Sequence, residues 1–94
     1  MRSNEFTKDP SAILDYEIDW SDWLETNSDT ISTSTWTVPS GITKTADTKT
    51  TTTTTIWLSG GTDGNTYECV NRIVTSAASP RTDERTIYII VKNK

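Results

Sequence analysis

The most restrictive feature of this 94-residue sequence is a strict alternation of apolar and acidic residues between positions 14 and 20. Side chains of a β-strand point alternately to the two faces of a sheet, whereas those of a helix return to one face every 3.6 residues. The segment therefore predicts a strand with one face in an apolar core and the other in solvent. Its residues, in order, are Leu14, Asp15, Tyr16, Glu17, Ile18, Asp19 and Trp20.

Three carboxylates on one face of this strand raise the alternative of a calcium site. Alternate strand positions lie ~7 Å apart with parallel side chains, and no neighbouring loop supplies converging oxygen ligands. A solvated outer face is therefore the favoured interpretation. We expect neither a metal nor another cofactor.

The composition also argues against an enzyme. The chain has no histidine and a single cysteine, Cys69, which argues against a zinc cluster, an imidazole-dependent triad and an internal disulfide. It has no glycine-rich phosphate loop, so a carboxylate pair or a lysine would be the chemistry left. Cys69 is interpreted as a small core residue, with a reactive thiol as the less favoured alternative.

Charge is unevenly spread along the chain. Residues 1–30 hold eight acidic and two basic side chains (net −6), and residues 31–94 hold five acidic and seven basic ones (net +2). Nucleic-acid binding depends on clustered lysine and arginine, so no nucleic-acid partner is expected. The acidic part is either a solvated face or an electrostatic contact for another copy or another protein.

The length predicts one domain. Residues 1–9 are polar without periodicity and are interpreted as a flexible arm, so that the domain spans residues 10–94. No segment approaches the ~20 apolar residues of a membrane helix, and the first residues lack the apolar core of a signal peptide. We expect a soluble protein without a membrane partner.

Strands dominate the rest of the chain, which contains twenty threonines and ten serines, because threonine is β-branched and favoured in sheets. Helix is expected to be nearly absent. In the connection over residues 21–29, Trp23 and Leu24 are expected to cover one end of the core. Ile31 is at an odd position and Trp36 at an even one, so in a regular strand they would point to opposite faces, which suggests a bulge near Thr35. A turn is predicted at 47–49, and further strands at 30–38, 42–46, 50–58, 67–74 and 85–91.

The strand at 50–58 begins with six threonines, so its register is weakly specified, and it is a candidate edge strand for pairing with a partner. If Ile56 and Leu58 point inward with Thr52 and Thr54, then Trp57 points outward. An outward tryptophan is either packed under a loop or offered to a partner, and the sequence leaves both open.

Short strands separated by turns predict an antiparallel β-sandwich of about seven strands. Tyr67 stands two residues before Cys69 and just after the turn at 59–65, which resembles the tyrosine corner of immunoglobulin-like domains. The fold prediction is therefore an immunoglobulin-like β-sandwich without its disulfide. The predicted core is Tyr16, Ile18, Trp20, Trp36, Val38, Ile56, Leu58, Tyr67, Cys69, Ile73, Ile87, Ile89 and Val91.

Four segments carry a family resemblance: residues 8–24, with Ile-Asp-Trp-Ser-Asp-Trp-Leu at 18–24; residues 31–41; Ile-Trp-Leu-Ser-Gly-Gly at 56–61; and residues 81–85. Together they resemble a small virion-morphogenesis protein of tailed bacteriophages and prophages, a fibre-tail adaptor-like family. The resemblance implies a structural protein of the virion, assembled in the cytoplasm of the bacterial host, and it brings no catalytic residues.

Three functions follow as hypotheses. The favoured one is an adaptor at the neck or tail that contacts other virion proteins, with self-association in a ring as a further hypothesis. The alternatives are a capsid decoration protein and a carbohydrate-binding module in which Trp23 and Trp57 stack on sugar. Loop position and aromatic character select the candidate interface residues, which are Trp23, Trp57, Arg81, Asp83, Arg85 and Tyr88.

Overall fold

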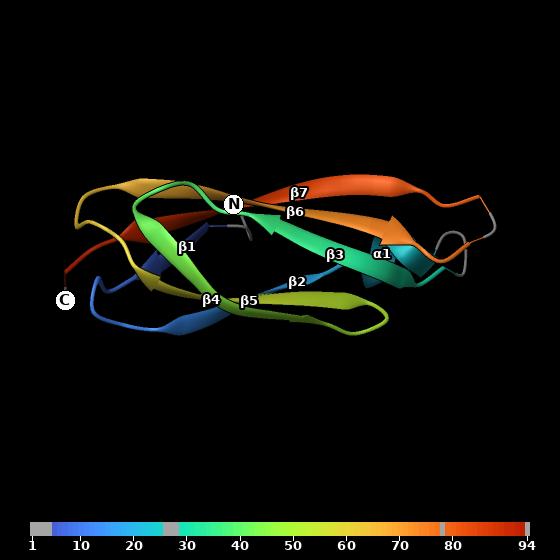
Figure 1. The fold of residues 1–94 in the computed structure, drawn as a ribbon, viewed down its shortest axis with the longest axis horizontal. Coiled ribbons are helices and arrows are strands. Elements are labelled where there is room, and N and C mark those ends of the chain that lie inside the picture. The colour runs from blue at the N-terminus through green and yellow to red at the C-terminus, as the bar shows by residue number, and fades with distance from the viewer. Residues whose placement is uncertain (1–4, 26–28, 78, 94) are drawn as a thin grey trace.

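The computed structural model describes residues 5–25, 29–77 and 79–93. Within these residues seven strands form two packed sheets, a four-stranded sheet of order β1-β7-β6-β3 and a three-stranded sheet of order β2-β5-β4, seen as two layers in Figure 1. The predicted all-β sandwich is confirmed. The elements are β1 (Glu5–Lys8), β2 (Leu14–Asp19), α1 (Ser21–Glu25), β3 (Ile31–Thr37), β4 (Ile42–Lys49), β5 (Thr53–Gly60), β6 (Thr66–Thr75) and β7 (Thr82–Val91).

Alternating burial builds the core between the two sheets. In β2 the apolar residues Tyr16 and Ile18 are buried and the acidic residues between them are exposed, as predicted. Every residue of the predicted core is buried except Val38, which is partly buried and packs against it. The core also contains Leu24, Ile31 and Ile42.

The amino-terminal segment is a correction. Residues 1–9 were predicted to be an arm without regular structure, but Glu5–Lys8 forms β1, which pairs in parallel with the end of β7; residues 1–4 lie outside the described residues. The Lys8 side chain is fully buried, and its Nζ donates hydrogen bonds to the carbonyl oxygens of Gly60 (2.7 Å) and Asp9 (2.9 Å). Burial lowers the pKa of this amine, while the nearby charge of Asp9 acts in the opposite direction.

Three predictions about the strands also turn out to be wrong. The register shift in β3 lies between Ile31 and Thr33, and not near Thr35. Residues 47–49 belong to β4, and the turn follows at Thr50, whose hydroxyl accepts the N–H of Thr53 (3.0 Å). The strand with the threonines, β5, is central in its sheet and not an edge strand, because both β2 and β4 pair with it.

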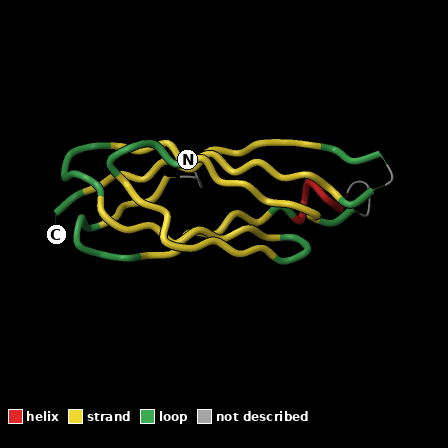
Figure 2. Tube along the Cα trace, in the orientation of Figure 1, coloured by secondary structure: helices red, strands yellow, loops and turns green. Residues whose placement is uncertain are grey.

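A short helix closes one end of the sandwich, and the carboxyl end of β7 lies at the opposite end, as Figure 2 shows. The prediction that Trp23 and Leu24 cover the core at this end is confirmed: Leu24 is buried and Trp23 is partly buried against the core. The adjoining loop is shorter than expected. β7 was predicted to begin at residue 85, but it begins at Thr82, so residues 82–84 belong to the strand and not to the loop.

A buried polar network joins the two sheets near this end. The Oδ1 atom of Asn71 in β6 accepts hydrogen bonds from the Trp20 indole (3.1 Å) and from the Thr54 hydroxyl of β5 (2.7 Å). Its Nδ2 group donates to the Ser34 hydroxyl (2.9 Å) and to the Thr35 carbonyl (3.3 Å) in β3. Because every donor and acceptor here has a partner, the network fixes how the sheets pack.

The opposite end is held by Tyr67. Its hydroxyl accepts a hydrogen bond from the N–H of Thr62 (2.9 Å), the bond to the upstream backbone that a tyrosine corner makes. Gly61 in this turn has φ +98°, and a Cβ there would lie 2.7 Å from Val91, so only glycine fits without strain. The immunoglobulin-like topology itself stays a prediction.

Candidate interaction surfaces

The end of the sandwich next to α1 carries two stacked arginine–tryptophan pairs, here called the end cluster (Trp20, Trp23, Arg81 and Arg85). The Arg81 guanidinium lies 4.3 Å from the ring centre of Trp23, and that of Arg85 lies 4.2 Å from the ring centre of Trp20. The two indoles meet edge to face at 5.6 Å. Three of the predicted interface residues are thus brought together, held by cation–π contacts worth about 0.5 to 1 kcal/mol each at partly exposed sites.

Arg85 has a second role at the edge of the three-stranded sheet. Its Nη1 atom donates to the main-chain carbonyl oxygen of Asp19 (3.1 Å), where β2 ends. The Asp19 carboxylate accepts the N–H of Ser21 (2.9 Å) at the start of α1. Hydrogen bonding by Ser21 lowers the pKa of Asp19, and the charge of Arg85 adds to that effect.

Asp83 lies between the two arginines in sequence but faces a different neighbourhood. It lines a shallow pocket of about 320 Å³ together with Arg72, Thr82 and Glu84. Its Oδ1 atom accepts the N–H of Glu84 (2.8 Å). The predicted group of charged residues around 81–85 is therefore divided between the end cluster and this pocket.

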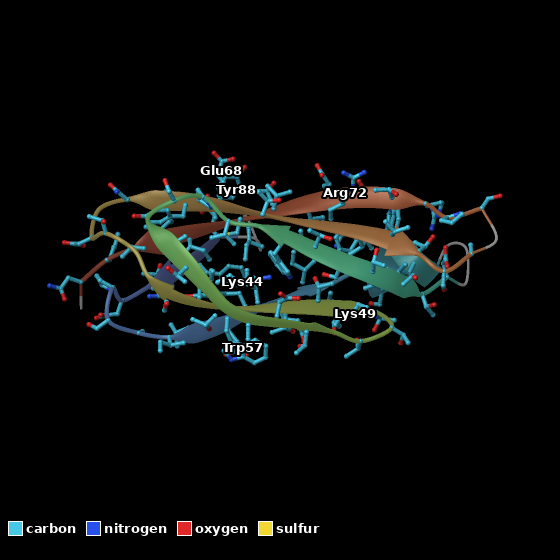
Figure 3. All side chains as sticks on the ribbon, in the orientation of Figure 1. Lys44, Lys49, Trp57, Glu68, Arg72 and Tyr88 are labelled. Carbon is cyan, nitrogen blue, oxygen red and sulfur yellow. The ribbon has the colours of Figure 1, made fainter. Side chains whose placement is uncertain are left out.

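The remaining two candidates, Trp57 and Tyr88, lie on opposite broad faces of the molecule. Trp57 extends from β5 on the outer face of the three-stranded sheet, and Tyr88 from β7 on the outer face of the four-stranded sheet (Figure 3). Both side chains are half-buried. Trp57 is flanked in register by Asp15 on β2 and Ala46 on β4.

Sequence reasoning missed the apolar residues around Tyr88. Val70 and Val74 in β6 and Ile90 in β7 alternate with buried residues and are half-buried on the same outer face. Outward positions of an antiparallel sheet are usually polar, so the apolar residues there make this face a candidate interaction surface. The sequence does contain a signal for them: in Tyr-Ile-Ile-Val at 88–91 and Arg-Ile-Val at 72–74, consecutive residues are apolar, so apolar side chains must point to both faces of the sheet.

The other hypotheses receive no support from this arrangement. Trp23 packs at the end of the sandwich and Trp57 on a broad face, so the two rings do not form one sugar-stacking platform.

The described residues contain no group of three or more potential metal ligands. Among the same residues, no helix has the length and apolarity needed to cross a membrane. Cys69 is fully buried, as predicted for a core residue, and burial raises its pKa to about 11.

Comparison with known proteins connects this fold to a function. Residues 8–90 match the Gp77 family, described as podophage GP4 fiber-tail adaptor protein gp77. No curated protein matches the chain. The match covers nearly all of the sequence, including β2, the end cluster and both broad faces. The chain therefore belongs to the podophage fiber-tail adaptor family Gp77, whose members are non-enzymatic structural components of the virion that bind tail and fiber proteins.

Proposed function

We propose that the chain joins tail to fiber by binding one partner on each broad face of the sandwich. The observation that carries this proposal is the placement of Trp57 and Tyr88 on opposite outer faces (Figure 3). Aromatic residues are enriched where proteins bind each other. A sandwich whose sheets are locked by a satisfied polar network also holds the two surfaces at a fixed separation, as an adaptor requires.

The face around Tyr88 has the composition of a small interface. Half-buried Val70, Val74 and Ile90 supply apolar area, and the register places Glu68 beside Tyr88 and Glu84 beside Arg72. Interfaces commonly combine an apolar centre with a charged rim. This face is proposed to bind through burial of its apolar residues, with little dependence on salt.

The face around Trp57 is more polar and more acidic. Trp57 stands between threonine-rich neighbours, and the column Asp15, Glu17 and Asp19 runs along β2 beside it. A partner with basic side chains is favoured on this face, and such contacts weaken as ionic strength rises. The two faces thus suit two chemically different partners.

Single substitutions should separate the two contacts. We expect Trp57→Ala and Tyr88→Ala each to weaken binding to one purified partner, tail or fiber protein, by at least about tenfold, because buried aromatic anchors carry much of the binding energy. Surface plasmon resonance with each partner measures this. The matched controls are Thr43→Ala and Thr66→Ala, exposed positions on the same two sheets, which should bind normally. Loss of both partners in one variant, or of neither in both variants, would contradict the two-face arrangement.

The end cluster is proposed as a third contact, and the pocket that Asp83 lines as a separate one. The Arg81 and Arg85 guanidinium groups are already ordered by the tryptophans beneath them, which lowers the entropy lost when a partner binds. A partner carboxylate that approaches either guanidinium would meet an oriented donor.

Self-association in a ring is a separate proposal. The charge difference between residues 1–30 and 31–94 supports it, since weak contacts between copies add up around a symmetric tail. Native mass spectrometry of the isolated chain at low and high salt tests it. A closed oligomer that dissociates at high salt is expected, and a monomer under both conditions would refute it.

We also propose an immunoglobulin-like topology. The pairings β2-β5-β4 and β7-β6-β3 correspond in order to strands BED and GFC of that fold, and Tyr67 occupies the position of its tyrosine corner. The parallel pairing of β1 with β7 places the first strand on the GFC side. An experimental structure compared with immunoglobulin domains tests this assignment.

A further inference from the structure

β2 has a free edge whose main-chain groups can be assigned by residue parity. β2 pairs only with β5 among the described residues, and the N–H of Trp20 continues that ladder by donating to the Thr52 carbonyl oxygen (2.8 Å). In an antiparallel pair, alternate residues turn both N–H and C=O to the same side. The even-numbered residues of β2 therefore face β5, and Asp15, Glu17 and Asp19 turn their main-chain groups to the free edge.

Arg85 confirms this parity and limits the open stretch. Its guanidinium donates to the carbonyl oxygen of Asp19, which agrees with that oxygen being turned away from β5 and available to a group outside the ladder. The N–H and C=O groups of Asp15 and Glu17 remain along the edge, and among the described residues none pairs with them. An edge of this kind is a template for an added strand.

A groove runs beside this edge between the two sheets. It has a volume of about 290 Å³, with Phe6, Ile18 and Ile87 among its walls and the acidic residues Glu17 and Asp19 at its rim. Phe6 of β1 packs on Tyr16 of β2, with ring centres 5.0 Å apart, next to this groove. The space is large enough for an aliphatic side chain, and its apolar walls favour one.

Exposed apolar residues mark the other end of the same edge. Ile13 is 64% exposed and Leu14 40% exposed, and no other large apolar side chain among the described residues is as exposed. Leu14 begins β2 and Ile13 directly precedes it, so they lie roughly 17 to 20 Å along the chain from Asp19 at the usual rise of about 3.4 Å per residue. One extended segment along β2 would cover both Leu14 and the groove.

The acidic face of β2 defines the chemistry of that segment. Side chains opposite each other on one sheet face interact, so the column Asp15, Glu17 and Asp19 favours lysine or arginine at alternate positions of an added strand. The positions between them would face the groove and should be apolar. The segment is thus an alternating basic and apolar strand.

No described strand of this chain has that pattern, which argues against a second copy as the occupant. β4 comes nearest, but its Lys44 is ion-paired with Asp47, and its other face consists of the polar or small residues Thr43, Ala46 and Thr48. Just before and within β7, Arg81 and Arg85 are engaged by tryptophans. The occupant therefore belongs to another protein.

We propose that the free edge of β2 accepts an extended, alternating basic and apolar segment of the tail or fiber protein, which adds a fourth strand to the three-stranded sheet. This inference rests on the proposed function, because it identifies the kind of contact made on the Trp57 side of the molecule. The segment bonds to the main chain of Asp15 and Glu17 and places an apolar side chain in the groove.

Hydrogen exchange of the full chain tests strand addition directly. The probe is a synthetic peptide of alternating lysine and valine, and the control is the same peptide with glutamate for lysine. We expect the lysine peptide to slow exchange of the Asp15 and Glu17 amides by at least tenfold, whereas the amides of Tyr16 and Ile18, already bonded to β5, change little. Unchanged exchange at Asp15 and Glu17 at saturating lysine peptide would overturn the proposal.

Two variants of the chain test whether the same edge binds the tail or fiber protein. Asp15→Lys with Glu17→Lys reverses the charge, and Glu17→Pro removes an N–H that faces the free edge and bonds to no described residue, a position where an edge strand tolerates proline. Both should lose at least tenfold in binding to one purified partner, tail or fiber, and keep the other. If the wild-type chain binds neither, the proposed function fails; if both variants bind as the wild type does, only strand addition fails. The charge-reversed variant decides if Glu17→Pro does not fold.

Discussion

Replacing Asn71 by leucine is expected to lower the free energy of unfolding by about 3 kcal/mol, because leucine is similar in size but makes none of the four hydrogen bonds of the amide. Trp20 and Thr54 lose the shared acceptor, and Ser34 and Thr35 lose their donor. Each buried polar group left without a partner costs about 1 to 3 kcal/mol. A domain of this size has a total stability of roughly 5 to 14 kcal/mol, so the loss should be visible in urea denaturation.

Two further variants show whether the loss comes from the network. Asn93→Leu makes the same substitution at an exposed position and should change stability by less than about 0.5 kcal/mol. Combining Asn71→Leu with Trp20→Phe removes the indole donor as well, so the double variant should lose less than the sum of the two single variants. Additive losses, or a loss below about 1 kcal/mol for Asn71→Leu, would show that the network contributes little.

Asn71 also shows how far residue alternation predicts the core. Tyr67, Asn71 and Ile73 share a parity in β6, so their common inward direction follows from the sequence. The strict pattern of β2 likewise predicts its strand, its buried face and its solvated face. What alternation cannot supply is the partner of a buried amide, since Thr54 in β5 and Trp20 just after β2 are both far from Asn71 in sequence.

The errors arise where local signals are weak. β1 has no apolar periodicity, and it becomes a strand through pairing with β7 and through burial of Lys8 under the carbonyl of Gly60. In the threonine run every residue favours a strand equally, so the turn is placed by Thr50 bonding to Thr53 and not by composition. Such boundaries depend on tertiary contacts that no single segment encodes.

The sequence analysis named individual interface residues, but it could not predict where on the folded molecule they lie or which of them come together. Aromatic and charged character selected Trp23, Arg81 and Arg85, but their stacking at one end depends on how α1 meets β7. The free edge of β2 could not be recognised in advance, because an acidic outer face looks the same on a central strand and on an edge strand. Strand order decides between them, and strand order is a property of the whole fold.

Stability should fall between about pH 9 and pH 11 because of Cys69. Burial raises the pKa of this thiol from 9.0 to about 11 in the folded protein, so in this window the unfolded chain loses the thiol proton and the folded chain keeps it. Ionisation then favours the unfolded state, and the loss is complete only above the folded pKa. At 1.36 kcal/mol per pKa unit, the shift of about two units corresponds to about 3 kcal/mol. Below pH 9 the thiol is protonated in both states and contributes no pH dependence.

Other groups titrate nearby, so the test is a difference between two proteins. The raised pKa of Tyr16 adds to the alkaline loss, whereas the lowered pKa values of Lys8 and Tyr67 act in the opposite direction. Cys69→Ala removes the thiol and, with it, only the last and smallest cause of the raised pKa of Tyr16, whose main cause is burial. Urea denaturation from pH 7 to pH 11 should show the wild type more stable than Cys69→Ala at pH 7, with the gap closing above pH 9. Parallel curves would mean that Cys69 ionises as readily in the folded protein as in the unfolded chain, and that its burial does not protect it from solvent.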